Sequence, residues 1–246
     1  MQFIRRKAPV LYKRKLASGI YLIRIEAPSI AESASPGQFI HINIPGKPLR
    51  RPISIYSRST GVIDIAFKVR GDGTAFLSLI KKGEFLDIIG PVGNTYPLLP
   101  GRPLFIAGGI GAAPLNFLAS HIETAGVFIC GTKTEYEHIP LRDVKIVGHE
   151  IVRISESRSR QLVTDLLPLY IENSDIVYAA GPAPMLKITA EVCAEYNKKC
   201  YISWEERMGC GIGLCQGCVI KTLSGFVRTC TEGPVFDADE VLWDEL

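Results

Sequence analysis

Four cysteines near the end of the chain have the spacing of a metal-binding site. They give the pattern C-x4-C-x2-C-x11-C and are Cys210, Cys215, Cys218 and Cys230. Four thiolates can hold a two-iron, two-sulfur (2Fe-2S) cluster, and C-x4-C-x2-C is the plant-type ferredoxin spacing. Four glycines surround these ligands: Gly209, Gly211, Gly213 and Gly217. Because glycine has no Cβ, it lets backbone N–H groups approach the sulfurs closely. The pattern therefore predicts a centre that transfers one electron at a time.

Structural zinc is the main alternative for these cysteines. Zinc sites usually draw their ligands from two closely spaced cysteine pairs, whereas only Cys215 and Cys218 form a tight C-x2-C pair here. A further alternative leaves the four thiols unligated in the core. The other cysteines, Cys130, Cys193 and Cys200, lie in apolar strand-like or helix-like runs, and we expect them to be buried as small hydrophobic side chains.

Two earlier segments carry groups suited to a flavin dinucleotide. In Arg51-Pro52-Ile53-Ser54 the arginine offers a fixed fork of donors and the serine a small one. Ala66-Phe67-Lys68 is soon followed by Gly71-Asp72-Gly73-Thr74, which opens a short helix. The free N–H groups at a helix start favour a phosphate. Residues 51–54 alone could equally form an ordinary surface turn, but the two segments together predict FAD binding.

A glycine-rich turn at residues 108–114 is the candidate for binding a nicotinamide nucleotide. Its glycines are Gly108, Gly109 and Gly111. The turn lacks the G-x-G-x-x-G fingerprint, because Pro114 occupies the third glycine position of a pattern read from Gly109. It still follows a short apolar run, at the end of a strand where α/β sheets bind ligands. Gly181-Pro182 ends a later run in the same way. A tight structural turn is the alternative.

The elements that must position these residues change character near residue 100. Before it, residues 19–25, 38–44 and 62–69 alternate apolar and polar side chains with the period of a half-buried strand. One short helix is expected at residues 74–82. This pattern predicts an antiparallel β-barrel, the FAD-binding domain, in residues 1–100.

After residue 100, short apolar runs alternate with helical patterns. The apolar runs are 103–107, 126–130, 144–147 and 175–179, and the helical stretches are 113–123, 161–170 and 184–197. Alternating strands and helices predict a parallel α/β sheet, here the NAD-binding domain in residues 101–207. Residues 208–246 are rich in glycine and cysteine and then acidic, so we expect them to form a small 2Fe-2S module.

Composition excludes several other classes of protein. The 246 residues are 47% hydrophobic and 22% charged, with a net charge of +3. These values exclude intrinsic disorder and give no bulk charge for nucleic acid. Seven cysteines, mostly clustered, do not fit a secreted disulfide scaffold. The uncharged stretch 103–120 is interrupted by glycines and a proline, so we expect a cytoplasmic protein without a membrane span.

Taken in order, these segments resemble the ferredoxin reductase-like flavoproteins, and more narrowly the electron transfer subunits of NAD-linked dihydroorotate dehydrogenases. The resemblance covers nearly the whole chain and is most specific over EERMGCGIGLCQGCV and RTCTEGPVF, within residues 205–236. It implies FAD contacts at residues 51–54, 66–68 and 73–74, and cluster ligation by the four cysteines. The chain departs from wider-family reductases at Ile53, where many have tyrosine, and at Ala180, where many have cysteine.

The resemblance also implies two kinds of subunit. A catalytic subunit with FMN would oxidise dihydroorotate in pyrimidine biosynthesis, with two copies of each chain in a heterotetramer. Electrons would pass through this chain's cluster to FAD and then, as a hydride, to NAD+. The chain itself would need no acid–base catalytic residue. Its acidic end, with six acids and no base from Thr229 to Leu246, either docks the partner or solvates the terminus.

Several alternatives remain at this stage. The chain could be the diaphorase subunit of a hydrogenase, a sulfide dehydrogenase or a ferredoxin–NADP reductase, or a zinc-stabilised binding module without enzymatic activity. NADP is the alternative nucleotide, since Arg158, Arg160 and Lys133 could hold a 2′-phosphate. Exposed charges near a loop are commoner than phosphate clamps, and we therefore expect NAD.

Overall fold

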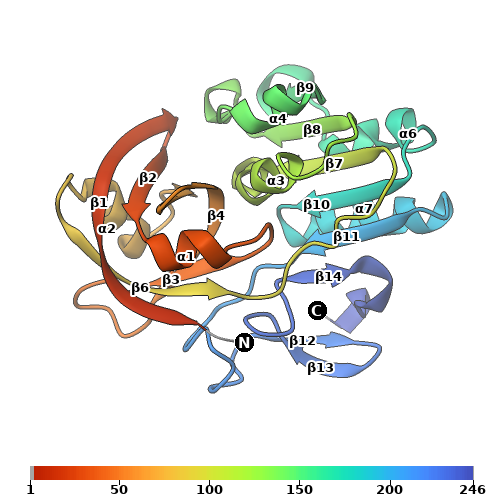
Figure 1. Ribbon diagram of the computed structural model, residues 1–246. Coiled ribbons are helices and arrows are strands. Elements are labelled where there is room, and N and C mark those ends of the chain that lie inside the picture. Colours follow the sequence, from red (N-terminus) through yellow and green to blue (C-terminus); the bar gives the residue numbers. More distant parts are fainter. Residues whose placement is uncertain (1–2, 246) are drawn as a thin grey trace.

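The computed structural model describes residues 3–245 and begins with a closed antiparallel barrel (Figure 1). Its strand order is β1-β2-β5-β4-β3-β6. The strands are β1 (Ile4–Ala17), β2 (Ile20–Glu26), β3 (Phe39–Ile42), β4 (Arg51–Ser59), β5 (Val62–Lys68) and β6 (Phe85–Val92). Two short helices lie between strands, α1 (Pro28–Ser33) and α2 (Asp72–Leu79). The predicted antiparallel barrel is confirmed. The sequence indicated α2 at 74–82 but gave no sign of α1.

Isoleucines fill the barrel because alternate residues of a strand point to the same side. Ile23 and Ile25 of β2, Ile40 and Ile42 of β3, and Ile63 of β5 are fully buried in one cluster. Burying each such side chain contributes about 1.5–3 kcal/mol. The alternate residues of β3 and β4 point to the outside of the barrel, so they are available to form a binding site.

The second part is a sheet with strand order β14-β11-β10-β7-β8-β9. Five strands are parallel: β7 (Pro103–Gly108), β8 (Val127–Thr132), β9 (Glu150–Ser155), β10 (Ile176–Ala180) and β11 (Lys199–Ser203). Phe105 and Tyr178 pack on one face with α3 (Ala112–Ala119) and α4 (Arg142–Val147), whereas Leu104 and Val177 pack on the other with α7 (Ala183–Glu195). The predicted parallel α/β sheet is confirmed.

The smaller elements complete this part. They are α5 (Glu156–Ser159), α6 (Leu167–Tyr170), and the 3-10 turns η1 (Gly109–Gly111), η2 (Glu135–Glu137), η3 (Val163–Leu166), η4 (Ala238–Glu240) and η5 (Trp243–Glu245). Within residues 3–245, none of the helices combines the length and apolar character that a membrane span requires.

One sequence interpretation of this part is wrong. The apolar run 144–147 lies in α4, and the neighbouring strand is β9. Leu141 and Val144, three residues apart, are buried, while Ile146 is 82% exposed, which is helical spacing. A run of four residues is too short to separate this period from that of a strand. Gly148, with a φ of 89°, ends the helix in the left-handed conformation.

The third part is a hairpin, β12 (Val219–Thr222) and β13 (Gly225–Arg228), below the sheet in Figure 1. The chain then enters β14 (Val235–Asp237), which pairs antiparallel with β11 of the sheet. The acidic end is bound to the same sheet, since Asp237 and Asp239 both pair with Lys199. The division at residues 100 and 207 stays a prediction, and β14 ties the last two parts together.

Asn94 fastens the carboxyl-terminal part to the end of the barrel. Its Nδ2 donates to the carbonyl oxygens of Glu232 and Val235 at 2.6 and 2.7 Å, and its Oδ1 accepts from the Val235 N–H at 2.9 Å. Three hydrogen bonds from one side chain thus hold the segment that leads into β14.

We expect Asn94→Ala to lower the free energy of unfolding by about 1–3 kcal/mol, since each lost hydrogen bond contributes about 1 kcal/mol and the side chain is only half-buried. Urea denaturation of the full chain measures this loss. Asn94→Asp is a second variant, which should be at least as destabilising, because it keeps the acceptor for Val235 but sets a carboxylate oxygen against the two carbonyl oxygens. An Asn94→Ala chain as stable as the parent would contradict the assignment.

Candidate functional site

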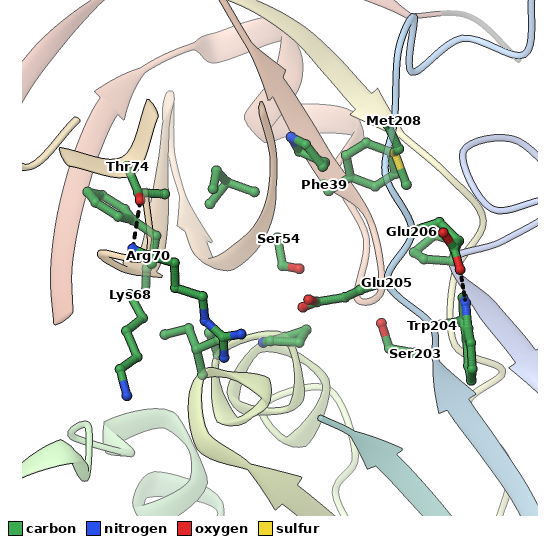
Figure 2. A pocket seen from close by; sticks show the side chains of 18 residues that line it. Phe39, Ser54, Lys68, Arg70, Thr74, Ser203, Trp204, Glu205, Glu206 and Met208 are labelled. Carbon is green, nitrogen blue, oxygen red and sulfur yellow. Dashed lines mark hydrogen bonds between the residues drawn. The ribbon is translucent and has the colours of Figure 1, made fainter. Parts of the chain in front are cut away.

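A cavity of about 230 Å³ lies where the barrel meets the sheet (Figure 2). Most residues predicted to hold FAD are in its wall: Pro52, Ile53 and Ser54 from β4, Ala66, Phe67 and Lys68 from β5, and Thr74 from α2. The wall is mainly apolar and includes a few polar side chains, among them Ser54 and Lys68. Such a cavity suits a flat aromatic ring held by a few directional contacts.

Arg51 and Gly73 meet at the start of α2, beside the cavity. A Cβ on Gly73 would lie only 2.6 Å from Arg51 Nε, so the guanidinium rests on the glycine. Thr74 Oγ1 accepts hydrogen bonds from the N–H groups of Arg70 and Gly71 at 2.9 and 3.2 Å. These contacts place the Arg51 guanidinium, with its several N–H donors, at the N-terminus of α2. The arrangement fits a diphosphate.

The two glycine turns of the sheet meet where its strand order reverses. β7 lies between β8 and β10, so the crevice at the carboxyl ends of β7 and β10 is where such sheets bind ligands. A Cβ on Gly111 would overlap the carbonyl oxygen of Ala180 at 2.1 Å, and one on Gly108 would lie 2.7 Å from Pro182 Cδ. Gly109 and Gly181 have φ values of 56° and 159°. The two turns therefore pack backbone against backbone at this crevice.

The glycines themselves do not line the cavity. The turn after β7 contributes Ile110, Ala113 and Pro114 instead. Gly108, Gly109, Gly111, Gly181 and Pro182 therefore shape the crevice beside the cavity. The predicted nicotinamide nucleotide contacts at these five positions remain a prediction.

Sequence reasoning missed several residues of the cavity wall. Figure 2 shows Glu205 pointing into the cavity, with Arg70 on the opposite wall and Phe39 and Met208 at the far end. Glu205 is exposed to the open cavity, but the protein atoms crowded around its carboxyl raise the pKa of that group, and the Arg70 guanidinium partly offsets this effect. Glu205 and Met208 belong to the segment EERMG, which the sequence associated only with the cluster. Phe39 and Arg70 lie outside any motif.

The four predicted cluster cysteines form two pairs. The N–H groups of Cys210 and Cys215 each donate to the sulfur of the other at 3.4 Å, and the Cys218 and Cys230 thiols also interact. Among residues 3–245, no three His, Cys, Asp or Glu side chains converge as ligands of a single metal ion. A two-iron cluster takes two thiolates at each iron, whereas one zinc needs four at a single point. Two pairs of thiols are an arrangement that a two-iron cluster can use, with one pair at each iron.

The backbone around the cysteines is also suited to a cluster. Sulfur atoms accept hydrogen bonds from the N–H groups of Ile212 at 3.5 Å and Gly213 at 3.2 Å. A Cβ on Gly209 would lie 3.1 Å from Cys215 Sγ, so a larger residue would crowd the ligand. Hydrogen bonds of this kind stabilise the negative charge of a cluster and tune its potential.

The cavity and the cysteines share a wall. Phe39 and Met208 line the cavity and also belong to the apolar cluster that contains Cys218 and Cys230. A flavin in the cavity would therefore be separated from a 2Fe-2S cluster on these cysteines by a thin layer of side chains that includes Phe39 and Met208. The remaining cysteines, Cys130, Cys193 and Cys200, are buried in the core, as predicted.

Comparison with known proteins shows the family. A model of the iron-sulfur cluster binding domain of dihydroorotate dehydrogenase B matches residues 205–242. The chain is 39% identical to the dihydroorotate dehydrogenase B (NAD(+)) electron transfer subunit of Caldanaerobacter subterraneus subsp. tengcongensis, over 96% of this chain and 98% of the relative. This chain belongs to that family of electron transfer subunits.

A second relative carries the same family name, and one solved structure has a similar fold. The subunit of the same name from a Geobacillus species is 32% identical, over 95% of this chain and 96% of the relative. Among solved structures, one chain of an NADH-dependent reduced ferredoxin-NADP oxidoreductase superposes with a TM-score of 0.88 at 28% identity, covering 98% of this chain and 91% of that one. The family expected from the sequence is confirmed.

We expect Gly73→Ala to weaken FAD binding about tenfold, since a Cβ would displace the Arg51 guanidinium and such overpacking costs about 1–3 kcal/mol. FAD titration of the apoprotein by fluorescence quenching measures the change. Gly71→Ala is the matched control, because a Cβ there meets no atom within 4 Å. Equal FAD affinity in the two variants would refute the proposed contact.

We expect Gly213→Ala to weaken retention of the cluster about tenfold, as changes around metal ligands often do. Its φ is +84° and a Cβ would lie 2.9 Å from Thr231 Cγ2. Gly225→Ala, at φ +102° with no atom within 4 Å, introduces backbone strain without crowding. Iron and acid-labile sulfide are measured in both variants. Full iron content in Gly213→Ala, or an equal loss in Gly225→Ala, would contradict the proposal that the glycine loop around the cysteines holds the cluster.

Proposed function

We propose that this chain carries electrons between the catalytic subunit of a dihydroorotate dehydrogenase and NAD+. Dihydroorotate would be oxidised on the FMN of that partner, and the electrons would cross this chain through a 2Fe-2S cluster and FAD. When bound, FAD supplies the conversion between single electrons and a hydride. The observation that carries the proposal is the wall of Phe39 and Met208 between the cavity and the paired cysteines.

The chain's own residues would bind and orient the cofactors. Arg51, Gly73 and Thr74 would hold the diphosphate of FAD, while residues 52–54 and 66–68 would enclose its ring system. The turns containing Gly108, Gly109, Gly111, Gly181 and Pro182 would admit the nicotinamide nucleotide to the open side of the ring. Cys210, Cys215, Cys218 and Cys230 would hold the cluster. No side chain needs to act as a catalytic acid or base.

The proposal extends to domains, nucleotide and assembly. It assigns FAD binding to residues 1–100, nicotinamide nucleotide binding to residues 101–207, and the cluster to residues 208–246. NAD+ is favoured over NADP+, because the relatives that show the family carry NAD(+) in their names. An assembly with two copies of each chain rests on the family resemblance alone.

Co-expression with a dihydroorotate dehydrogenase catalytic chain tests the proposal. We expect a brown-yellow complex that contains FMN, FAD, iron and acid-labile sulfide, and that reduces NAD+ with dihydroorotate under anaerobic conditions. Its mass, from light scattering, tests the two-plus-two assembly. A parallel assay with NADP+ tests the nucleotide preference.

A Cys215→Ala chain tests the cluster step of the path separately from the step between FAD and the nicotinamide nucleotide. It should still pass electrons from NADH to a dye through FAD, but lose reduction of NAD+ by dihydroorotate. Failure of the parent chain to form the complex, or to yield NADH, would favour a diaphorase subunit of another redox system. A colourless parent chain that contains zinc would indicate a binding module.

A further inference from the structure

The imidazole of His41 is buried between the barrel and the loop that carries the first cluster cysteine. His41 lies on β3 and is 0% exposed. Its Nδ1 is 3.1 Å from the carbonyl oxygen of Cys210. A carbonyl oxygen can only accept a hydrogen bond, so Nδ1–H donates, and Nε2 of the neutral ring carries the lone pair. The His41 side chain is therefore hydrogen-bonded to the backbone of Cys210, a proposed cluster ligand.

The loop lies directly against this ring, with no space between them for a side chain. Gly211 follows Cys210 with a φ of +70°, and a Cβ there would lie 2.3 Å from His41 Nδ1. The imidazole thus rests directly on the peptide between Cys210 and Gly211. The backbone of His41 is fixed in turn, because Arg50 Nη1 donates to its carbonyl oxygen at 3.3 Å.

The same strand face carries the flavin cavity. Residues directly opposite each other in an antiparallel ladder share a face, as do alternate residues of one strand. Phe39 pairs with Ser54, and His41 pairs with Pro52. Phe39, Ser54 and Pro52 line the cavity. The hydrogen bond from His41 therefore joins the wall of the cavity to the cluster loop.

Simple packing does not account for a histidine at this position. Among residues 3–245, its Nε2 is a buried polar atom without a hydrogen-bond partner. An unpaired buried acceptor costs about 1–3 kcal/mol, which an apolar side chain of similar size would avoid. What an apolar side chain cannot supply is the Nδ1–H donor to Cys210.

We propose that His41 is a positioning residue for electron transfer between the cluster and the flavin. Its hydrogen bond fixes the Cys210–Gly211 peptide against β3, which sets how the cluster is oriented toward the cavity and polarises the backbone beside one ligand. This inference rests on the proposed function, because it requires both cofactors to be bound. It assigns a role in the path to a residue that acts through the backbone of a proposed cluster ligand.

The test uses the full chain with its cofactors, in three forms: the parent, His41→Leu and His41→Asn. Leucine fills space without donating, whereas the asparagine Nδ2 stands the same number of bonds from Cα as the histidine Nδ1 and can donate to Cys210. Stopped-flow absorbance follows flavin reduction and then cluster reduction after mixing with NADH. The electron paramagnetic resonance spectrum and the midpoint potential of the cluster are recorded for each form.

In His41→Leu we expect the rate of cluster reduction, relative to flavin reduction in the same trace, to fall about tenfold. The cluster spectrum should shift as well, or the cluster be lost. His41→Asn should restore both properties toward those of the parent. The proposal is overturned if leucine behaves like histidine, or if asparagine behaves like leucine. A parent chain that lacks flavin or cluster would instead refute the proposed function.

Discussion

The antiparallel register between β3 and β4 is the constraint on which both proposed cofactor sites depend. Ile40 faces Ile53 across this ladder and is fully buried in the barrel, which leaves the alternate pairs, Phe39 with Ser54 and His41 with Pro52, on the outside. A slip of one residue would turn every one of these side chains to the opposite face. The hydrophobic core therefore specifies the site, because the isoleucines can be buried in only one register.

The width of the cavity is set by a second core, which is continuous between the barrel and the sheet. Ile20, Leu22 and Tyr56 of the barrel pack in one cluster with α3 and with Phe105 of β7. The Tyr56 hydroxyl also donates to the carbonyl oxygen of Pro140 at 2.6 Å. Such packing holds the two walls at a fixed spacing before any ligand binds. A preformed site of this kind avoids the entropic cost of ordering the walls around a ligand.

The sequence predicted the parts of the site that are local. The cysteines, residues 51–54 and residues 73–74 are short runs whose chemistry can be read without the fold. The structure brings Arg51 against Gly73 and pairs the cysteines, while their roles as cofactor ligands stay predictions. Phe39, Arg70 and Glu205 could not be found in this way, because each joins the cavity only through tertiary packing. The same limit explains the error at residues 144–147, where a four-residue run has no resolvable period. Nothing in the short run 235–237 signalled that it would join a sheet.

That last strand has a consequence for how the protein can be divided. β14 follows the final cluster cysteine in the chain but belongs to the edge of the sheet, beside β11. Excising residues 208–246 to transplant the cluster elsewhere would strip this edge and expose the backbone N–H and C=O groups of β11, which invites aggregation. A chimera with another reductase would have to exchange β11 and β14 together. Recombination in this family is therefore constrained to preserve the pairing of these two strands, and not only the four thiols.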